Sequence, residues 1–284
     1  MLNRNIETFL ACETDYAEAK TVLFGAPYDS TTSFRPGARF GAAAIRRESF
    51  GLESYSPYQD RDLADARVMD SGDLELPFGG PEMALTMIEA RAGQILQDGK
   101  RPFLIGGEHL VTLGAIRAAA KAHKDLHIIH FDAHADLRED YLGAALSHAT
   151  VMRRAWDILG DGRIFQYGIR SGDQAEFSWG KTHVKTQLFD FDGLEKTVKK
   201  LKSKPVYLSI DLDVLDPSVF PGTGTPEPGG VSFMELLNAT LAVCKNCNVL
   251  GLDVVELAPN YDASGVSTAV AGKLIREMLL AVGR

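Results

Sequence analysis

Short apolar segments rich in β-branched residues recur along the chain, and each has the length of a β-strand. They lie at residues 21–25, 67–70, 103–105, 127–131, 163–167, 206–210 and 249–254. Their residues are apolar at successive positions instead of alternating with polar ones, which is typical of parallel strands buried on both faces. The pattern therefore predicts a parallel sheet that is covered on both sides.

Longer segments between these strands repeat apolar residues at helical spacing. The first begins with Pro81, carries a single apolar stripe and ends before Gly99, as an amphipathic helix does. The predicted helices lie at residues 81–97, 110–122, 149–159, 194–201, 233–243 and 268–280. Alternating strands and helices indicate right-handed crossovers. Because no linker or repeat interrupts residues 1–284, we predict a single three-layer α/β/α domain with a mostly parallel central sheet.

Charge and hydropathy exclude several classes of protein. The chain of 284 residues has a formal net charge of −8 and no run of basic residues, so nucleic acid is not an expected partner. An acidic protein attracts small cations. No apolar stretch reaches the roughly 18 residues of a spanning helix, and the N-terminus lacks a signal-like apolar run. We therefore predict a cytoplasmic protein with no membrane partner.

The three cysteines are Cys12, Cys244 and Cys247, and they do not suggest a disulfide framework in a chain of this length. Cys244 and Cys247 have the spacing of a redox or zinc motif. However, no second cysteine pair or nearby histidine completes a zinc site. We predict ordinary thiols at a turn from helix to strand.

Side chains that can bind metal follow the predicted strand at residues 127–131. Asp132, His134 and Asp136 occupy alternate positions, which point the same way in an extended chain. Parallel α/β sheets bind ligands beyond the carboxyl ends of their strands. We therefore expect these three side chains to converge on one point, with a solvated polar cluster as the alternative.

Two further strand ends carry similar residues. Asp211 and Asp213 follow the strand at residues 206–210, and neighbouring carboxylates repel each other unless a cation lies between them. The alternative is an exposed turn. His109 follows the strand at residues 103–105 after two glycines that permit close backbone approach. Taken alone, a histidine at a helix start is more often structural.

Together these positions offer four carboxylates and two imidazoles, which is too many ligands for one four-coordinate zinc ion. The set suits two ions. Its many oxygens favour two Mn²⁺ ions, with Co²⁺ or Zn²⁺ as substitutes. Two such ions generate hydroxide at neutral pH beside an electrophile.

In this order and spacing, the segments GGEH, FDAHAD and SIDLDVLDP resemble the signature of the arginase–agmatinase (ureohydrolase) family. The resemblance covers nearly the whole chain, through GAPYD, FRPGARFG, YGIRS, PGTGTPEPGG and DVVE. It implies an arginase-like fold and a homo-oligomer, a trimer or hexamer. One departure is Ala149, where many relatives have glycine. The metal ligands that the resemblance implies are His109, Asp132, His134, Asp136, Asp211 and Asp213.

The resemblance also implies a reaction, the hydrolysis of a guanidinium to urea and an amine by a bridging hydroxide. Asp136, as a bridging ligand, would pass a proton to the leaving nitrogen. His148 matches the family's proton shuttle, and a free imidazole titrates near neutrality. Glu256 matches the glutamate that binds the guanidinium, which it can do through paired hydrogen bonds, and Thr225 matches a supporting threonine. Asp253 is expected to face away or to be structural.

The expected substrate is a small cationic guanidine. The segments GTGTPEPGG and DLREDYLG look most like those of family members that act on agmatine, which yields urea and the polyamine precursor putrescine. Glu139 or Asp140 is a candidate to face the tail ammonium, with solvated surface as the alternative for both. Alternative functions are a guanidinobutyrase or arginase, a catalytically silent regulatory scaffold, and a metallohydrolase of the related deacetylase fold.

Overall fold

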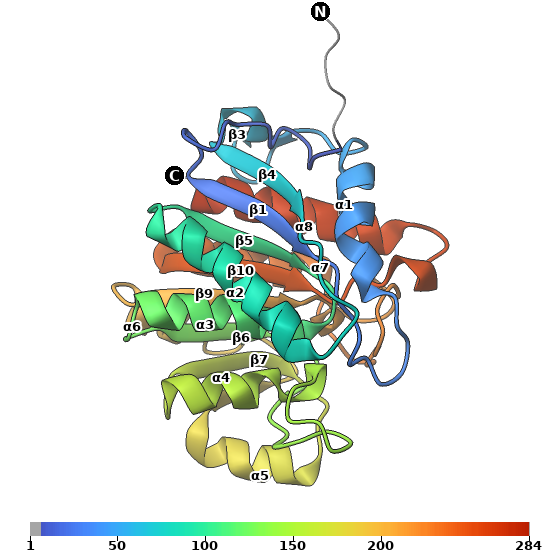
Figure 1. Cartoon of the computed structure of the whole chain (residues 1–284), viewed down its shortest axis with the longest axis vertical. Coiled ribbons are helices and arrows are strands. Elements are labelled where there is room, and N and C mark those ends of the chain that lie inside the picture. The colour runs from blue at the N-terminus through green and yellow to red at the C-terminus, as the bar shows by residue number, and fades with distance from the viewer. Residues whose placement is uncertain (1–6, 284) are drawn as a thin grey trace, which may run out of the picture.

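An eight-stranded sheet forms the centre of the computed structural model, which describes residues 7–283 (Figure 1). Its strand order is β4-β1-β5-β10-β9-β6-β7-β8, and every neighbouring pair is parallel. In chain order the strands are β1 (Thr21–Ala26), β4 (Val68–Asp73), β5 (Arg101–Gly106), β6 (His127–Phe131), β7 (Ile164–Ile169), β8 (Lys185–Leu188), β9 (Pro205–Asp211) and β10 (Asn248–Val255). A separate pair joins β2 (Tyr55–Ser56) to β3 (Arg61–Asp62). The predicted parallel sheet is confirmed.

Helices cover both faces of this sheet, which confirms the three-layer α/β/α architecture. One face packs against α1 (Gly41–Ser49), α6 (Leu194–Leu201), α7 (Phe233–Asn246) and α8 (Val266–Val282). The other face packs against α2 (Pro81–Gln97), α3 (Thr112–Ala122), α4 (Val151–Leu159) and α5 (Gln174–His183). Figure 1 shows helices on both sides of the sheet. Each layer of helices shares its own apolar core with the sheet. None of the helices within residues 7–283 has the length and apolar character needed to cross a membrane.

All seven predicted strands and all six predicted helices are present, but three longer elements were not predicted. The edge strand β8 pairs on one side only, and its residues are mostly exposed, so it lacks the apolar run of a central strand. The helix α1 is made largely of small and charged residues, and Ile45 is its single large apolar residue. The helix α5 begins with a capping box between Asp173 and Glu176, which is a readable sequence signal.

The sheet order explains why residues far apart in sequence meet. β5, β10, β9 and β6 are adjacent, and since all are parallel, their carboxyl ends lie at one edge. In register, Ile210 lies beside Phe131 and Asp211 beside Val255. The residues that follow these strands therefore converge there. At the same edge a Cβ on Gly107 would lie 1.9 Å from the carbonyl oxygen of Tyr28, so glycine is required for this close approach.

The cysteines are free thiols, as predicted. Cys12 and Cys244 are buried, and Cys247 is partly buried. Cys244 lies near the end of α7, and Cys247 directly follows that helix, at the turn into β10. Burial raises the pKa of Cys244 to about 12 and that of Cys247 to about 11, which disfavours the reactive thiolate at neutral pH.

Candidate metal centre

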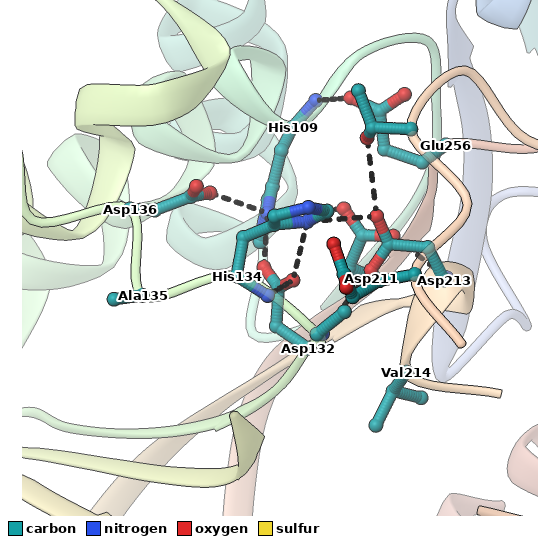
Figure 2. Close-up of polar contacts among 12 residues, drawn as sticks. His109, Asp132, His134, Ala135, Asp136, Asp211, Asp213, Val214 and Glu256 are labelled. Carbon is teal, nitrogen blue, oxygen red and sulfur yellow. Dashed lines mark hydrogen bonds and ion pairs between the residues drawn. The ribbon is translucent and has the colours of Figure 1, made fainter. Parts of the chain in front are cut away.

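All six predicted ligands lie together at the carboxyl edge of the central strands (Figure 2). They form two groups. The first surrounds His109, whose Nδ1 lies 3.0 Å from Asp132 Oδ2, 3.0 Å from Asp136 Oδ2 and 3.3 Å from Asp211 Oδ2. One nitrogen thus faces oxygens from three carboxylates, which is a donor set suited to a divalent cation.

The hydrogen bonds behind His109 determine which ring nitrogen is free to bind metal. Ser209 Oγ donates to Asp253 Oδ1 over 2.8 Å, and it therefore accepts from His109 Nε2 at 3.0 Å. The proton of the neutral ring is then on Nε2, and Nδ1 has a lone pair. This Nδ1 is buried and has no hydrogen-bond partner within residues 7–283. Its orphaned lone pair fits a metal ligand, and Asp253 supports the site from behind.

The second group surrounds His134. Its Nδ1 lies 3.0 Å from Asp213 Oδ2 and 3.6 Å from Asp132 Oδ1. Asp132 therefore has one oxygen in each group (Figure 2). Of the two histidines, Asp136 pairs with His109, whereas Asp132 has an oxygen near each of them among the described residues.

The electrostatics of these groups also fit cations. Burial, followed by repulsion from Asp213 and Asp132, raises the pKa of Asp211 well above its usual range. Burial and repulsion from Asp132 raise the pKa of Asp136 to about 7. These carboxylates are costly to ionise when no positive charge is present. The chain thus contains buried clusters of histidine and aspartate that are suited to metal.

The backbone reaches this arrangement differently from the extended alternation that the sequence suggested. β6 ends at Phe131, His134 forms only an isolated bridge with Ser171, and Asp136 has a φ of +54°. Asp213 lies in a 3-10 helix rather than an extended segment. The expected convergence is therefore present, but the reason given for it was wrong beyond the strand ends. Aspartate tolerates the left-handed region better than most residues.

Glu256 directly follows β10 and is the next acidic group at this edge. It has a φ of +67°, and its Oε1 accepts a hydrogen bond from the backbone N–H of His109 over 2.6 Å (Figure 2). Burial, followed by repulsion from Glu108, raises its pKa well above the usual range. A cationic ligand would therefore be stabilised beside Glu256.

A cavity of about 290 Å³ opens onto these residues. Its lining includes His109, His134, Asp136, Arg138, Tyr141, His148, Asp173, Asp211, Thr225 and Glu256. Thr225 Oγ1 donates to Asp213 Oδ2 over 3.3 Å, so this threonine supports a predicted ligand.

Glu139 and Asp140 do not line the cavity. Both are exposed, and Asp140 accepts a hydrogen bond from the backbone of Gly143. Two acidic residues that the sequence analysis did not select line the cavity instead, the buried Glu176 and the solvent-exposed Asp173. The sequence feature that could have identified Asp173 is its capping box with Glu176, which places a carboxylate at the start of a helix near a strand end.

His148 lines the same cavity and is held by Thr31. Its backbone N–H donates to Thr31 Oγ1 over 3.1 Å, and its Nδ1 lies 3.0 Å from the carbonyl oxygen of Thr31. A carbonyl only accepts, so Nδ1 carries the proton and Nε2, 3.3 Å from Ser33 Oγ, has the lone pair. Burial lowers the pKa of His148 to about 4, which favours the neutral imidazole at pH 7.

Glu108, within the GGEH segment, is a further buried residue of the site to which the sequence analysis assigned no role. Its carboxylate accepts hydrogen bonds from the backbone N–H and hydroxyl of Thr31, at 3.1 and 2.8 Å, and from the hydroxyl of Thr32 at 3.1 Å. Glu108 thus anchors the loop that holds His148. The sequence feature that could have identified Glu108 is its place in the GGEH motif, directly before His109.

Comparison with known proteins agrees with this geometry. Residues 19–281 match the sequence model described as the arginase family. An agmatinase of Bacillus subtilis (strain 168) is 48% identical over 277 residues, which cover 96% of each chain. The crystal structure of agmatine ureohydrolase of Thermoplasma volcanium has a TM-score of 0.89 at 34% identity, and covers 98% of this chain and 95% of its own.

A third relative shows that the fold is shared across different activities. Proclavaminate amidino hydrolase from Streptomyces clavuligerus has a TM-score of 0.85 at 32% identity, covering 99% of this chain and 98% of its own. The sequence match extends over most of the chain, and seven of the nine candidate site residues line one cavity. The chain therefore belongs to the arginase family.

Proposed function

We propose that this chain is a two-metal hydrolase that converts agmatine and water to putrescine and urea. The observation that carries the proposal is the position of Glu256, a buried carboxylate in the same cavity as the two histidine–aspartate groups. A guanidinium held by Glu256 would lie beside the metal centre. The similarity to agmatinases over 96% of the chain supports agmatine as the substrate.

The metal ligands in this proposal are the six residues described above, and the ions are two Mn²⁺. Asp132 would be shared, His109, Asp136 and Asp211 would complete one site, and His134 and Asp213 would complete the other. When bound, two such ions would lower the pKa of water and so make hydroxide available at neutral pH. The high proportion of carboxylate oxygens favours Mn²⁺ over a softer ion.

The protein residues bind the substrate and move its protons. Glu256 Oε1 already accepts the N–H of His109, which orients the carboxylate toward a guanidinium. The reaction would add the oxygen of water to the guanidinium carbon and break the bond from that carbon to the tail nitrogen, which would release urea and the amine. Asp136 passes the added hydroxyl's proton to the tail nitrogen. His148 accepts at Nε2 the proton released when water ionises and returns it to the amine.

The rim of the cavity suits a tail that ends in an ammonium. Asp173 lines it, and its side chain is 47% exposed. Arg138, the cation at the rim, lies 3.2 Å from Glu176 and 3.8 Å from Asp173, so its charge is already compensated. An ammonium would be attracted to Asp173, whereas a carboxylate at the same place would be repelled.

Substrate choice tests the proposal directly. The purified chain loaded with Mn²⁺ is incubated with agmatine, arginine or 4-guanidinobutyrate, and urea is measured. A misplaced like charge costs several kcal/mol, so we expect kcat/KM for agmatine to exceed that for either carboxylate-bearing compound by about 100-fold or more. Urea release from arginine or 4-guanidinobutyrate but not from agmatine would overturn the substrate assignment and leave the metal chemistry in place.

Replacing His148 by alanine tests the proton transfer. The variant should keep both ions because His148 is not a ligand, and it should lose about 10²–10⁴-fold in kcat, the usual contribution of a general acid–base residue. Metal content and urea release measure the two effects. His123→Ala, at an exposed position after α3, serves as the control and should retain full activity. A His148→Ala enzyme that is fully active between pH 7 and 9 would contradict the role.

A further inference from the structure

His130 is a buried histidine that the proposed function does not use. It lies in β6, two residues before Asp132, and its Nε2 is 2.8 Å from Asp132 Oδ2. Its ring is centred 5.0 Å from that of His109. By distance alone His130 could be a metal ligand, because a ring nitrogen of His130 lies close to the ligand atoms of His109, Asp132 and Asp136. The alternative is that Nε2 carries a proton and donates it to Asp132.

The side chain of Gln166, in β7, distinguishes these roles. Its Nε2 lies 2.7 Å from the carbonyl oxygen of Ala135, which can only accept, so the nitrogen of the amide must point there. Its Oε1 accepts from the hydroxyl of Thr186 in β8 at 3.0 Å. Both contacts give the same orientation of the amide. The amide nitrogen also lies 3.1 Å from His130 Nδ1.

The orientation of the amide determines the tautomer of His130. The amide nitrogen of Gln166 donates, so Nδ1 of His130 must accept and cannot carry a proton. In a neutral imidazole the proton is then on Nε2, which has no lone pair for a metal ion. The same nitrogen is placed to donate to Asp132 Oδ2. This is the opposite of His109, whose Nε2 donates to Ser209 and whose Nδ1 is free to bind metal.

We infer that His130 is a positioning residue, which holds the shared ligand Asp132 through an Nε2–H hydrogen bond and whose tautomer is set by Gln166. The inference rests on the proposed two-metal site. The bond restrains the carboxylate that has one oxygen near His109 and the other near His134. Groups that orient a metal ligand in this way contribute to metal affinity. The hydrogen-bonded chain extends from Thr186, in the edge strand, to the metal centre.

The experiment measures the apparent Kd for Mn²⁺ by competition with a chelator in the full-length chain. His130→Phe keeps a ring of similar size but removes the donor, and should weaken Mn²⁺ binding about 10–100-fold. His130→Gln places an amide N–H near the position of Nε2 and should restore affinity to within about threefold of the unmodified protein. His127→Phe, at the start of the same strand where the ring contacts Arg163, is the matched control and should leave the Kd unchanged.

Each outcome bears on the inference. If His130→Phe binds Mn²⁺ normally, the positioning role is wrong. If the phenylalanine and glutamine variants are equally weak, the imidazole itself is a ligand and the donor role is wrong. Should His130→Phe fail to fold, judged by the melting temperature of the metal-free protein, Gln166→Leu decides. It removes the amide that restrains the orientation and tautomer of the His130 ring, and should weaken binding, whereas unchanged or tighter binding overturns the inference.

These measurements are independent of catalysis. If the unmodified chain binds Mn²⁺ but releases no urea from agmatine, the proposed reaction fails while the role of His130 is still tested. If urea is released normally but His130→Phe has an unchanged Kd, only the inference about His130 fails.

Discussion

Replacing Asp132 by asparagine is expected to remove both metal ions and abolish urea release. Asp132 has an oxygen near each histidine, so neutralising it removes charge from both groups at once. Unaided water has a pKa of about 15.7, against about 7 when metal activates it, so activity should fall below detection. Elemental analysis after desalting measures the ions per chain, and a urea assay measures the rate.

The variant Asp136→Asn tests whether the loss of both ions is specific to Asp132. Asp136 lies beside His109 alone, so its variant should lose one ion and retain the other. Asp125→Asn is a suitable control. Asp125 precedes β6, the strand that Asp132 follows, and it pairs with Arg163 and Lys204 at the surface. It should retain two ions and full activity. An Asp132→Asn protein that still held two ions would show that Asp132 is not the shared ligand.

Replacing Glu256 by glutamine is expected to leave the metal in place and to remove most of the binding of the guanidinium. The amide keeps an oxygen for the N–H of His109 but loses the charge and the second acceptor. Removing one partner of a buried charge pair costs about 2–5 kcal/mol. The loss in kcat/KM should therefore be about 30- to 4,000-fold.

The control for this change is Glu227→Gln. Glu227 lies in the same segment as Thr225, but its side chain does not line the cavity. It should retain metal content and kcat/KM. If Glu256→Gln kept full kcat/KM on agmatine, the guanidinium would have to be held elsewhere and the binding mode proposed for Glu256 would be wrong.

The relatives give a reason to test substrates rather than assume one. The amidino hydrolase from Streptomyces clavuligerus shares this fold with a TM-score of 0.85, yet its name specifies another substrate. Fold and reaction class are therefore more widely shared than the recognition of the substrate tail. In this chain Asp173, Arg138 and Tyr141 line the cavity, so under the proposed function substrate choice would depend on the loops after β6 and β7.

The sequence by itself determined most of the secondary structure and the positions of the candidate metal ligands. Strands buried on both faces are continuous apolar runs, and amphipathic helices have apolar residues every three to four positions. Both patterns can be recognised from the local sequence. The exposed edge strand β8 is polar and was not readable in this way. Asp132, His134, Asp136, Asp211 and Asp213 were selected from their places after strands, whereas His109 was secured only by the family resemblance.

Only the tertiary structure decided which of these residues pair with one another and which ring nitrogens are free. Three findings depend on contacts between distant segments. Asp132 has an oxygen near each of His109 and His134. His109 has a free lone pair whereas His130 is placed to donate, and Asp173 lines the cavity whereas Glu139 and Asp140 do not. Sheet order and register bring these segments together, and long-range pairing sets both. A tautomer, likewise, is fixed by the partner across the fold. The local sequence does not specify that partner. The six candidate ligands could therefore be identified from the sequence, but their individual roles could not.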